Sequence, residues 1–195
     1  NGGRLACGAV VNAAGYHAHE IAGMIGVGLP VRPRKRIVYV FDCRDKPSRA
    51  PLTIDPTGVW CRPEGANFIG GISPPEADDP DSTDFEIDYG LYEDVVWPTL
   101  AHRIPAFEAI KLVRAWVGHY DYNTLDQNAI LGPHPEIGNF YFANGFSGHG
   151  LQQSPAVGRA IAELIAYGTY RSLDLRRFGY ERVVNSVPIS ELNVV

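Results

Sequence analysis

The residues best suited to binding chemistry form one glycine-rich segment: Gly145, Phe146, Ser147, Gly148, His149, Gly150, Leu151 and Gln152. It follows an apolar run at 139–143, which predicts a strand, and precedes residues 155–167, whose apolar spacing predicts a helix. Ser154 is expected to cap that helix and Pro155 to open it. A flat ligand could lie against such a turn, with the unpaired N–H groups of the helix N-terminus directed at its electron-rich atoms. The alternative is a tight turn whose glycines only supply unusual backbone angles.

His149 is the titratable side chain inside this segment and the candidate catalytic residue. A histidine there could orient a ligand or move a proton near neutral pH. A loop histidine that makes a structural hydrogen bond is the alternative. No metal site is expected, because neither the histidines nor the three cysteines have metal-ligand spacing.

Two further segments are candidates for ligand contact. Small residues end the apolar run at 7–14 and would let a ligand approach the backbone: Asn12, Ala13, Ala14 and Gly15. An ordinary strand end is the alternative. Trp116, Gly118 and Tyr120 could border a ligand, although aromatic residues at alternating spacing are more often plain core.

Composition excludes several classes of protein. The net charge is −5 and no basic stripe is present, so nucleic acid is not an expected partner. Three cysteines indicate a reducing compartment rather than a disulfide scaffold. No apolar stretch reaches the roughly 20 residues of a membrane-spanning helix. The acidic run at 76–88 is interpreted as a solvated loop followed by a negatively charged helix start.

The order of the predicted elements indicates an α/β (α+β) fold. A strand at 7–14 and a helix at 17–26 come first. A block dominated by strands follows, with a strand at 36–41, a hairpin of 58–62 with 67–71, an exposed loop at 73–84 and a strand at 110–118. A helix at 84–97 is expected to end or kink at Pro98. The chain begins with Asn1 rather than methionine, which favours a fragment whose N-terminal part is missing.

Taken together, the segments resemble the D-amino-acid-oxidase and sarcosine-oxidase family of flavoproteins. The glycine-rich segment with residues 154–158 is similar to that family's C-terminal flavin motif, 12–15 to its strand end beside the FAD, and 126–133 to the loop before its last FAD-domain strand. The resemblance implies the C-terminal portion of a glutathione-reductase-type FAD domain with an inserted antiparallel-sheet substrate domain. The implied segments are the end of the FAD domain (1–28), the sheet domain (29–122), a return to the FAD domain (123–170) and a tail packed on the surface (171–195).

The resemblance also implies FAD as cofactor, bound by the segments named above. The family's G-x-G-x-x-G unit is absent here, so the site is expected to be incomplete in this chain. Sarcosine oxidases carry a lysine where this chain has Gln152, which argues against fast oxidase chemistry. They tether FAD through a cysteine whose position is His119 here, so non-covalent FAD is expected, and a covalent link to the histidine is the alternative.

Within this family, the chain also resembles a mitochondrial member associated with assembly of respiratory complex I. This resemblance implies a mitochondrial location, in the matrix or on the matrix side of the inner membrane with peripheral association, and complex I subunits or assembly intermediates as partners. The alternative function is an FAD-dependent dehydrogenase or oxidase of amines or N-methyl amino acids.

Overall fold

The computed structural model describes residues 2–47 and 49–189. The chain divides into two units: unit 1 comprises the residues up to Pro33 and from Tyr120 onward, and unit 2 is Arg34–His119. Strands β2 (Val31–Cys43) and β6 (Ile110–Asn123) are continuous across the two boundaries. The chain combines helices with two sheets, which confirms the predicted α/β (α+β) class.

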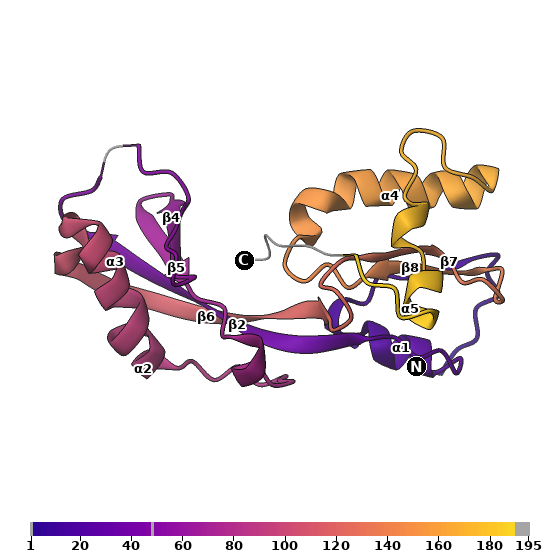
Figure 1. Cartoon of the computed structure of the whole chain (residues 1–195), viewed down its shortest axis with the longest axis horizontal. Coiled ribbons are helices and arrows are strands. Elements are labelled where there is room, and N and C mark those ends of the chain that lie inside the picture. Colours follow the sequence, from indigo (N-terminus) through magenta and orange to yellow (C-terminus); the bar gives the residue numbers. More distant parts are fainter. Residues whose placement is uncertain (1, 48, 190–195) are drawn as a thin grey trace. The chain divides into compact units, whose positions relative to one another are not determined.

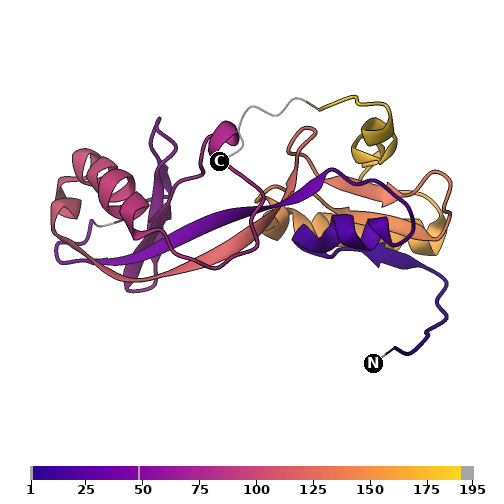
Figure 2. The same ribbon diagram turned by 90° about the horizontal axis from the view of Figure 1, so that it is seen from below.

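Unit 1 has a three-stranded sheet between helices. Its strand order is β1 (Val10–Asn12), β8 (Phe140–Asn144) and β7 (Ile130–Pro133), with β1 parallel and β7 antiparallel to β8. Helix α4 (Gly150–Tyr167) lies along one side of the strands and α1 (Ala18–Gly23) along the other (Figure 1). In Figure 2, where the molecule is seen from below, α1 runs beside the strands. A 3-10 turn, Gly15–His17, joins β1 to α1.

The alternating side chains of β8 build both faces of this sheet. Phe140 and Phe142 are buried in the cluster that contains Ala18 and Tyr180, whereas Tyr141 and Ala143 pack against the cluster formed with α4. This two-residue alternation is the geometry of a strand covered on both faces. It confirms the strand predicted at 139–143.

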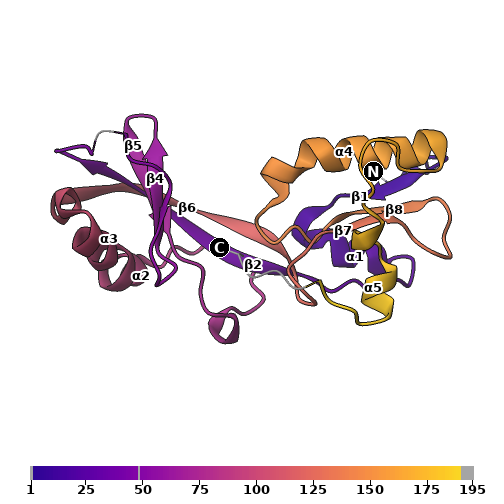
Figure 3. The same cartoon turned by 45° about the horizontal axis from the view of Figure 1, so that its top comes forward.

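Unit 2 has an antiparallel hairpin in a five-stranded sheet. The order is β3 (Thr53–Ile54), β4 (Trp60–Glu64), β5 (Asn67–Gly71), β2 and β6. β4 pairs with β5 in the register Trp60–Gly71, which confirms the predicted hairpin (Figure 3). The core of unit 2 includes alternate residues of β2 from Ile37 to Cys43, together with the packed rings of Phe41, Phe68 and Phe107.

The predicted helix at 84–97 is wrong at both ends. Helix begins only after Asp88, whose carboxylate accepts a hydrogen bond from the Leu91 N–H at 2.9 Å. It then runs through α2 (Tyr89–Leu91), a π-helical turn (Tyr92–Val96) and α3 (Trp97–Arg103). Because the wider π turn already changes the hydrogen-bond register before Pro98, the missing N–H does not end the helix. A 3-10 turn, Pro105–Ala109, leads into β6.

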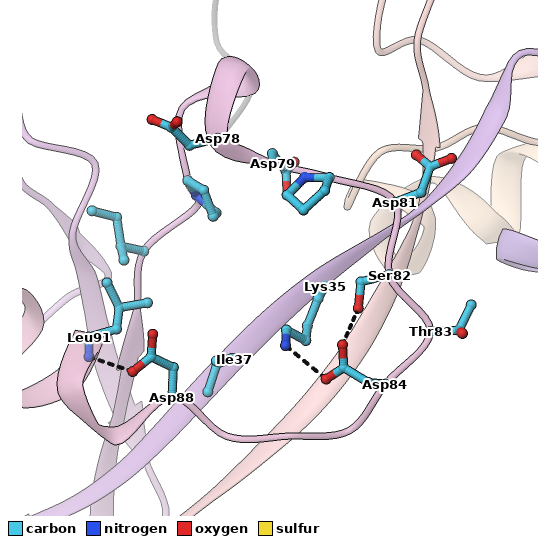
Figure 4. Close-up of a pocket in the computed structure, with 13 residues that line it drawn as sticks. Lys35, Ile37, Asp78, Asp79, Asp81, Ser82, Thr83, Asp84, Asp88 and Leu91 are labelled. Atoms are coloured by element: carbon cyan, nitrogen blue, oxygen red, sulfur yellow. Dashed lines mark hydrogen bonds and ion pairs between the residues drawn. The ribbon is translucent and has the colours of Figure 1, made fainter.

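The acidic run is also less exposed than the sequence suggested. Both carboxylate oxygens of Asp79, which is buried, accept hydrogen bonds from Arg36 at 2.8 Å. Asp84 accepts from Lys35 at 2.8 Å and from Ser82 at 2.6 Å, as Figure 4 shows. The run, which includes the 3-10 turn Glu76–Asp78, is therefore tied to the basic residues of β2 instead of being solvated throughout. These ion pairs join residues more than 40 positions apart, so local sequence could not show them.

The described part of the C-terminal segment is integrated into unit 1 and does not merely lie on its surface. It contains a 3-10 turn (Arg176–Phe178) and α5 (Glu181–Val184). Leu175, Tyr180 and Arg182 are buried, and the Tyr180 hydroxyl donates to the Gly28 carbonyl at 2.6 Å. The Tyr180 ring also stacks on Phe142, with ring centroids 4.7 Å apart. Across the described residues, no helix is both long and apolar enough to cross a membrane.

Glu163 of α4 holds the turn that follows this helix. Its carboxylate accepts hydrogen bonds from the Ser172 hydroxyl at 2.7 Å and from the N–H groups of Arg171 and Ser172 at 2.8 and 3.0 Å. These bonds, led by that of the Ser172 hydroxyl, lower the pKa of Glu163 to about 2. The charged carboxylate is bonded in the folded state and free in the unfolded one, so it stabilises the fold.

We expect Glu163→Gln to lower the melting temperature at pH 7, because the amide offers one acceptor oxygen instead of two. The carboxylate's contribution is complete above its ordinary pKa of 4.5 and is lost as the pH falls toward 2. The gap between wild type and variant should therefore narrow from pH 7 to pH 3 in thermal unfolding followed by circular dichroism. Glu136→Gln, at an exposed position, is the matched control. A gap that is constant with pH would contradict this role.

Candidate functional site

The glycine-rich segment connects β8 to α4 in unit 1. Three of the four residues from Gly145 to Gly148 have left-handed backbone angles: Gly145 has φ 74°, Ser147 φ 49° and Gly148 φ 98°. Ser147 is fully buried, and its φ is uncommon for a residue with a side chain. Such a conformation persists where the surroundings fix it, so the neighbours of the loop matter.

The end of β6 supplies those neighbours. The Ser147 N–H donates to the Asp121 carbonyl at 3.2 Å, and the Asn123 N–H donates to the Ser147 hydroxyl at 3.0 Å. The Phe146 N–H donates to the Asp121 carboxylate at 3.1 Å. Three hydrogen bonds thus attach the loop to two residues of β6, Asp121 and Asn123. This attachment explains how Ser147 is held in its unusual conformation.

Tyr120 limits what can stand at position 148. A methyl group added to Gly148 would lie 2.5 to 2.9 Å from three atoms of the Tyr120 ring and hydroxyl, which is closer than real contacts allow. Gly148 therefore serves both its backbone angle and the close approach of the ring. Of the predicted aromatic residues, Tyr120 is the one that the structure brings to the loop within unit 1.

The ends of β1 and β8 are joined by two asparagines. The buried Asn144 amide donates to the Asn12 carbonyl at 3.1 Å, and the buried Asn12 amide donates to the Ala18 carbonyl at 2.8 Å. Ala13 and Ala14 are exposed beyond this point, and Gly15 has φ 58° with open space where a side chain would begin. The predicted small-residue segment thus offers uncovered backbone beside a rigid strand end.

Helix α4 starts earlier than predicted, at Gly150 instead of after Ser154. His149 is the N-cap and makes no capping bond through its side chain. Pro155 lies inside the helix, where it cannot donate to the Leu151 carbonyl, and the Ser154 hydroxyl donates to that carbonyl instead at 2.9 Å. Ser154 therefore satisfies a carbonyl group in the first turn of α4 and is not the N-cap of the helix.

The N-terminus of α4 is available to a ligand. Among the described residues, none accepts a hydrogen bond from the N–H groups of Gly150, Leu151 or Gln152. The first turn contains no acidic residue, and the Leu151 side chain is 89% exposed. The positive end of an 18-residue helix is thus neither capped nor neutralised by this part of the chain.

The remaining predicted residues lie in unit 2. Trp116 and Gly118 are on the part of β6 that belongs to that unit, and Trp116 is exposed. The His119 ring nitrogen Nε2 lies 2.8 Å from the Asp84 carbonyl, and the ring meets Phe85 edge-on. These three residues are not part of the cluster in unit 1.

Comparison with known proteins assigns the family. The sequence profile described as FAD dependent oxidoreductase (DAO) matches residues 1–164. The chain belongs to this family. FAD-dependent oxidoreductase domain-containing protein 1 of Bos taurus is 49% identical over 190 residues, which are 90% of this chain and 39% of the relative. The protein of the same name from Xenopus laevis is 46% identical over 203 residues, 97% of this chain and 41% of the relative.

The solved structures agree with this assignment. L-proline dehydrogenase from P. horikoshii matches with a TM-score of 0.80 at 28% identity, over 91% of this chain and 47% of that one. The chain spans about two fifths of the length of the two relatives above. The flavoprotein family predicted from the sequence is thus confirmed, and membership implies FAD as the cofactor.

The residues present in unit 1 fit an FAD dependent oxidoreductase. The uncapped N–H groups of α4 suit an electron-rich group, and the small residues 13–15 leave room for a ligand against backbone. The buried Asn144 Oδ1 has no donor among the described residues, so a ligand hydroxyl could satisfy it. The chain therefore retains polar groups and space of the kinds that a flavin requires.

Sequence reasoning missed the polar residues that shape this site: Asp121, Asn123 and Asn144. Asn144 directly precedes the glycine-rich segment, and a buried amide at a strand end could have been suspected from its position alone. Asp121 and Asn123 contact a loop 24 or 25 residues away, which no local pattern reveals. The ring of His149 has no hydrogen bond within the described part of the chain.

Proposed function

We propose that residues 12–15 and 145–152 form the isoalloxazine side of a non-covalent FAD site in an oxidoreductase. The observation that carries the proposal is the uncapped N-terminus of α4 directly behind a loop that β6 holds in shape. Family membership supports FAD as the ligand.

Bound FAD supplies a two-electron acceptor for oxidation of a substrate. The contribution of this chain is to bind and orient. The N–H groups of Gly150, Leu151 and Gln152 would stabilise negative charge on a bound ring system. His149, at the N-cap, is proposed to position a substrate or hold a proton. Gln152 is neutral, so the positive charge at this end of α4 comes from the helix itself.

Non-covalent binding is proposed from the surroundings of His119. Its Nε2 is placed to donate a hydrogen bond to the Asp84 carbonyl, which occupies one of the two ring nitrogens that a covalent link could use. Denaturing the protein expressed from its complete gene should therefore release all FAD into the supernatant. Flavin that stays with the precipitated chain would contradict this proposal.

The biological role that we propose is in assembly of mitochondrial respiratory complex I, by a protein located in the matrix or on the matrix face of the inner membrane. The support is the likeness in sequence to a mitochondrial family member with that association. Depletion of the protein should lower the amount of assembled complex I on native gels. Rescue by a variant that cannot bind FAD would assign a scaffold role, and unaltered complex I after depletion would overturn the proposal.

A second candidate function is a dehydrogenase of secondary amines or N-methyl amino acids. The observation that favours it is the 28% identity, over 91% of this chain, to L-proline dehydrogenase. We expect anaerobic addition of a substrate of this class to bleach the flavin absorbance near neutral pH. A flavin that no amine or amino acid reduces would exclude this function while leaving FAD binding intact.

A further inference from the structure

Asp121 is an acidic residue of β6 that contacts loop 145–149, the part of the proposed FAD site between β8 and α4. Its carboxylate oxygen Oδ2 accepts a hydrogen bond from the Phe146 N–H at 3.1 Å, and its carbonyl accepts one from the Ser147 N–H at 3.2 Å. One residue thus fixes two successive peptide groups of the loop. Both contacts lie within unit 1.

The surroundings of Asp121 are unusual for a carboxylate. Burial raises its pKa, and the N–H groups of the loop, led by that of Phe146, act in the opposite direction. No ion pair with a basic side chain is found for it among the described residues. Burying a carboxylate without such a pair costs free energy. The hydrogen bonds from the loop N–H groups to Asp121 compensate for that cost.

The loop needs such an anchor, because its conformation is unfavourable. Ser147 is held at φ 49°, and Gly148 is pressed against the Tyr120 ring. Phe146 directly precedes Ser147 and Gly148, and α4 begins four residues after Phe146, at Gly150. A shift of the Phe146 peptide would therefore displace the N–H groups that are proposed to face FAD.

We propose that Asp121 is a positioning residue, whose carboxylate sets the shape of loop 145–149 and thereby the direction of the α4 N–H groups toward the flavin. The inference rests on the proposed FAD site. It assigns Asp121 no contact with substrate or with the reacting atoms. What it requires is an acceptor oxygen at this position rather than a negative charge.

The test uses the protein expressed from its complete gene, with three variants. In Asp121→Ala the Phe146 N–H loses its acceptor, and we expect FAD affinity to fall about tenfold or more. In Asp121→Asn the amide oxygen can still accept, so affinity should stay within about threefold of wild type. Asp174→Ala, which removes an exposed carboxylate of the same unit, is the matched control and should bind FAD normally.

Two measurements separate positioning from general loss of structure. FAD affinity is measured by quenching of flavin fluorescence, and amide hydrogen exchange of the peptide covering 145–152 is measured without FAD. Exchange should rise in Asp121→Ala only, while the rest of unit 1 stays protected. Normal FAD affinity in Asp121→Ala, or equal loss in Asp121→Asn, would overturn the proposal.

Failure of the underlying FAD site is distinguishable from failure of this inference. Wild-type protein that binds no FAD would overturn the proposed function and the flavin part of the inference together. Hydrogen exchange would then still decide whether Asp121 holds the loop. A rise in exchange throughout unit 1 would show that Asp121 supports the fold in general and would also overturn the positioning role.

Discussion

Replacing Arg182 by alanine should lower the free energy of unfolding by about 3–5 kcal/mol, the range found when one partner of a buried ion pair is removed. Arg182 donates to the Asp126 carboxylate at 2.5 Å, and the two side chains are 6% and 2% exposed. It also donates to the carbonyls of Asn128 and Ala129 at 2.9 and 2.7 Å. The variant leaves Asp126 charged and buried without its cation.

The loss should extend to loop 145–149, because the contacts of Arg182 continue through Asp126 and Asn123 to Ser147. Asp126 accepts a hydrogen bond from the Asn123 amide at 2.9 Å, and the Asn123 N–H donates to the Ser147 hydroxyl. Asp126 also accepts from the Ile189 N–H at 2.8 Å, which ties down the end of the described chain. Loss of the Arg182–Asp126 ion pair should therefore weaken the proposed FAD binding as well as lower the free energy of unfolding.

Urea unfolding of the protein followed by circular dichroism measures the effect. Arg177→Ala removes the same charge from an exposed position nearby and should change stability by less than about 0.5 kcal/mol. Arg182→Lys keeps the charge but loses the fork that reaches the carboxylate and two carbonyls, so an intermediate loss is expected. Equal stability of Arg182→Ala and Arg177→Ala would contradict the structural role of the pair.

Sequence alone predicted the elements whose signals are local. The strand at 139–143 and the hairpin of β4 and β5 depend on alternation and turn residues within a few positions, and both are present. The predictions were wrong where the structure depends on contacts between distant residues or on an irregular helical turn. The acidic run is held by arginines more than 40 residues away, and the π turn before Pro98 has no signature in composition.

The candidate site divides in the same way. A strand, a glycine-rich turn and a helix are contiguous in sequence, so the loop at 145–150 could be singled out from its pattern. The residues that hold this loop, Asp121 and Asn123, could not be predicted. They contact the loop only because the fold places β6 beside it. Ser154 was misassigned as a cap because a serine before a proline is typical of a helix start, whereas here the pair lies one turn inside α4.

Gly148→Ala is the second change from which we expect a large effect, and it acts on the loop itself. The added methyl group would meet the Tyr120 ring at 2.5 Å, and the backbone angle of 98° is one that residues with side chains rarely adopt. Either the ring or the loop must move. The strain of about 1–3 kcal/mol corresponds to roughly 5- to 150-fold in an equilibrium constant if it is expressed in FAD binding.

A control variant and a double variant separate the effect of the ring contact from that of the backbone angle. Gly138→Ala, in the exposed turn between β7 and β8, has open space and an ordinary backbone angle, so it should leave both FAD affinity and melting temperature unchanged. Gly148→Ala combined with Tyr120→Ala removes the collision but not the backbone strain, so FAD affinity should recover only in part. Full recovery would show that the ring alone requires glycine, and no loss in the single variant would show that the loop can relax without affecting the flavin. Because Tyr120 and Asp121 are adjacent on β6, a partial recovery would indicate that this strand holds the loop by contact with the ring and by hydrogen bonds together.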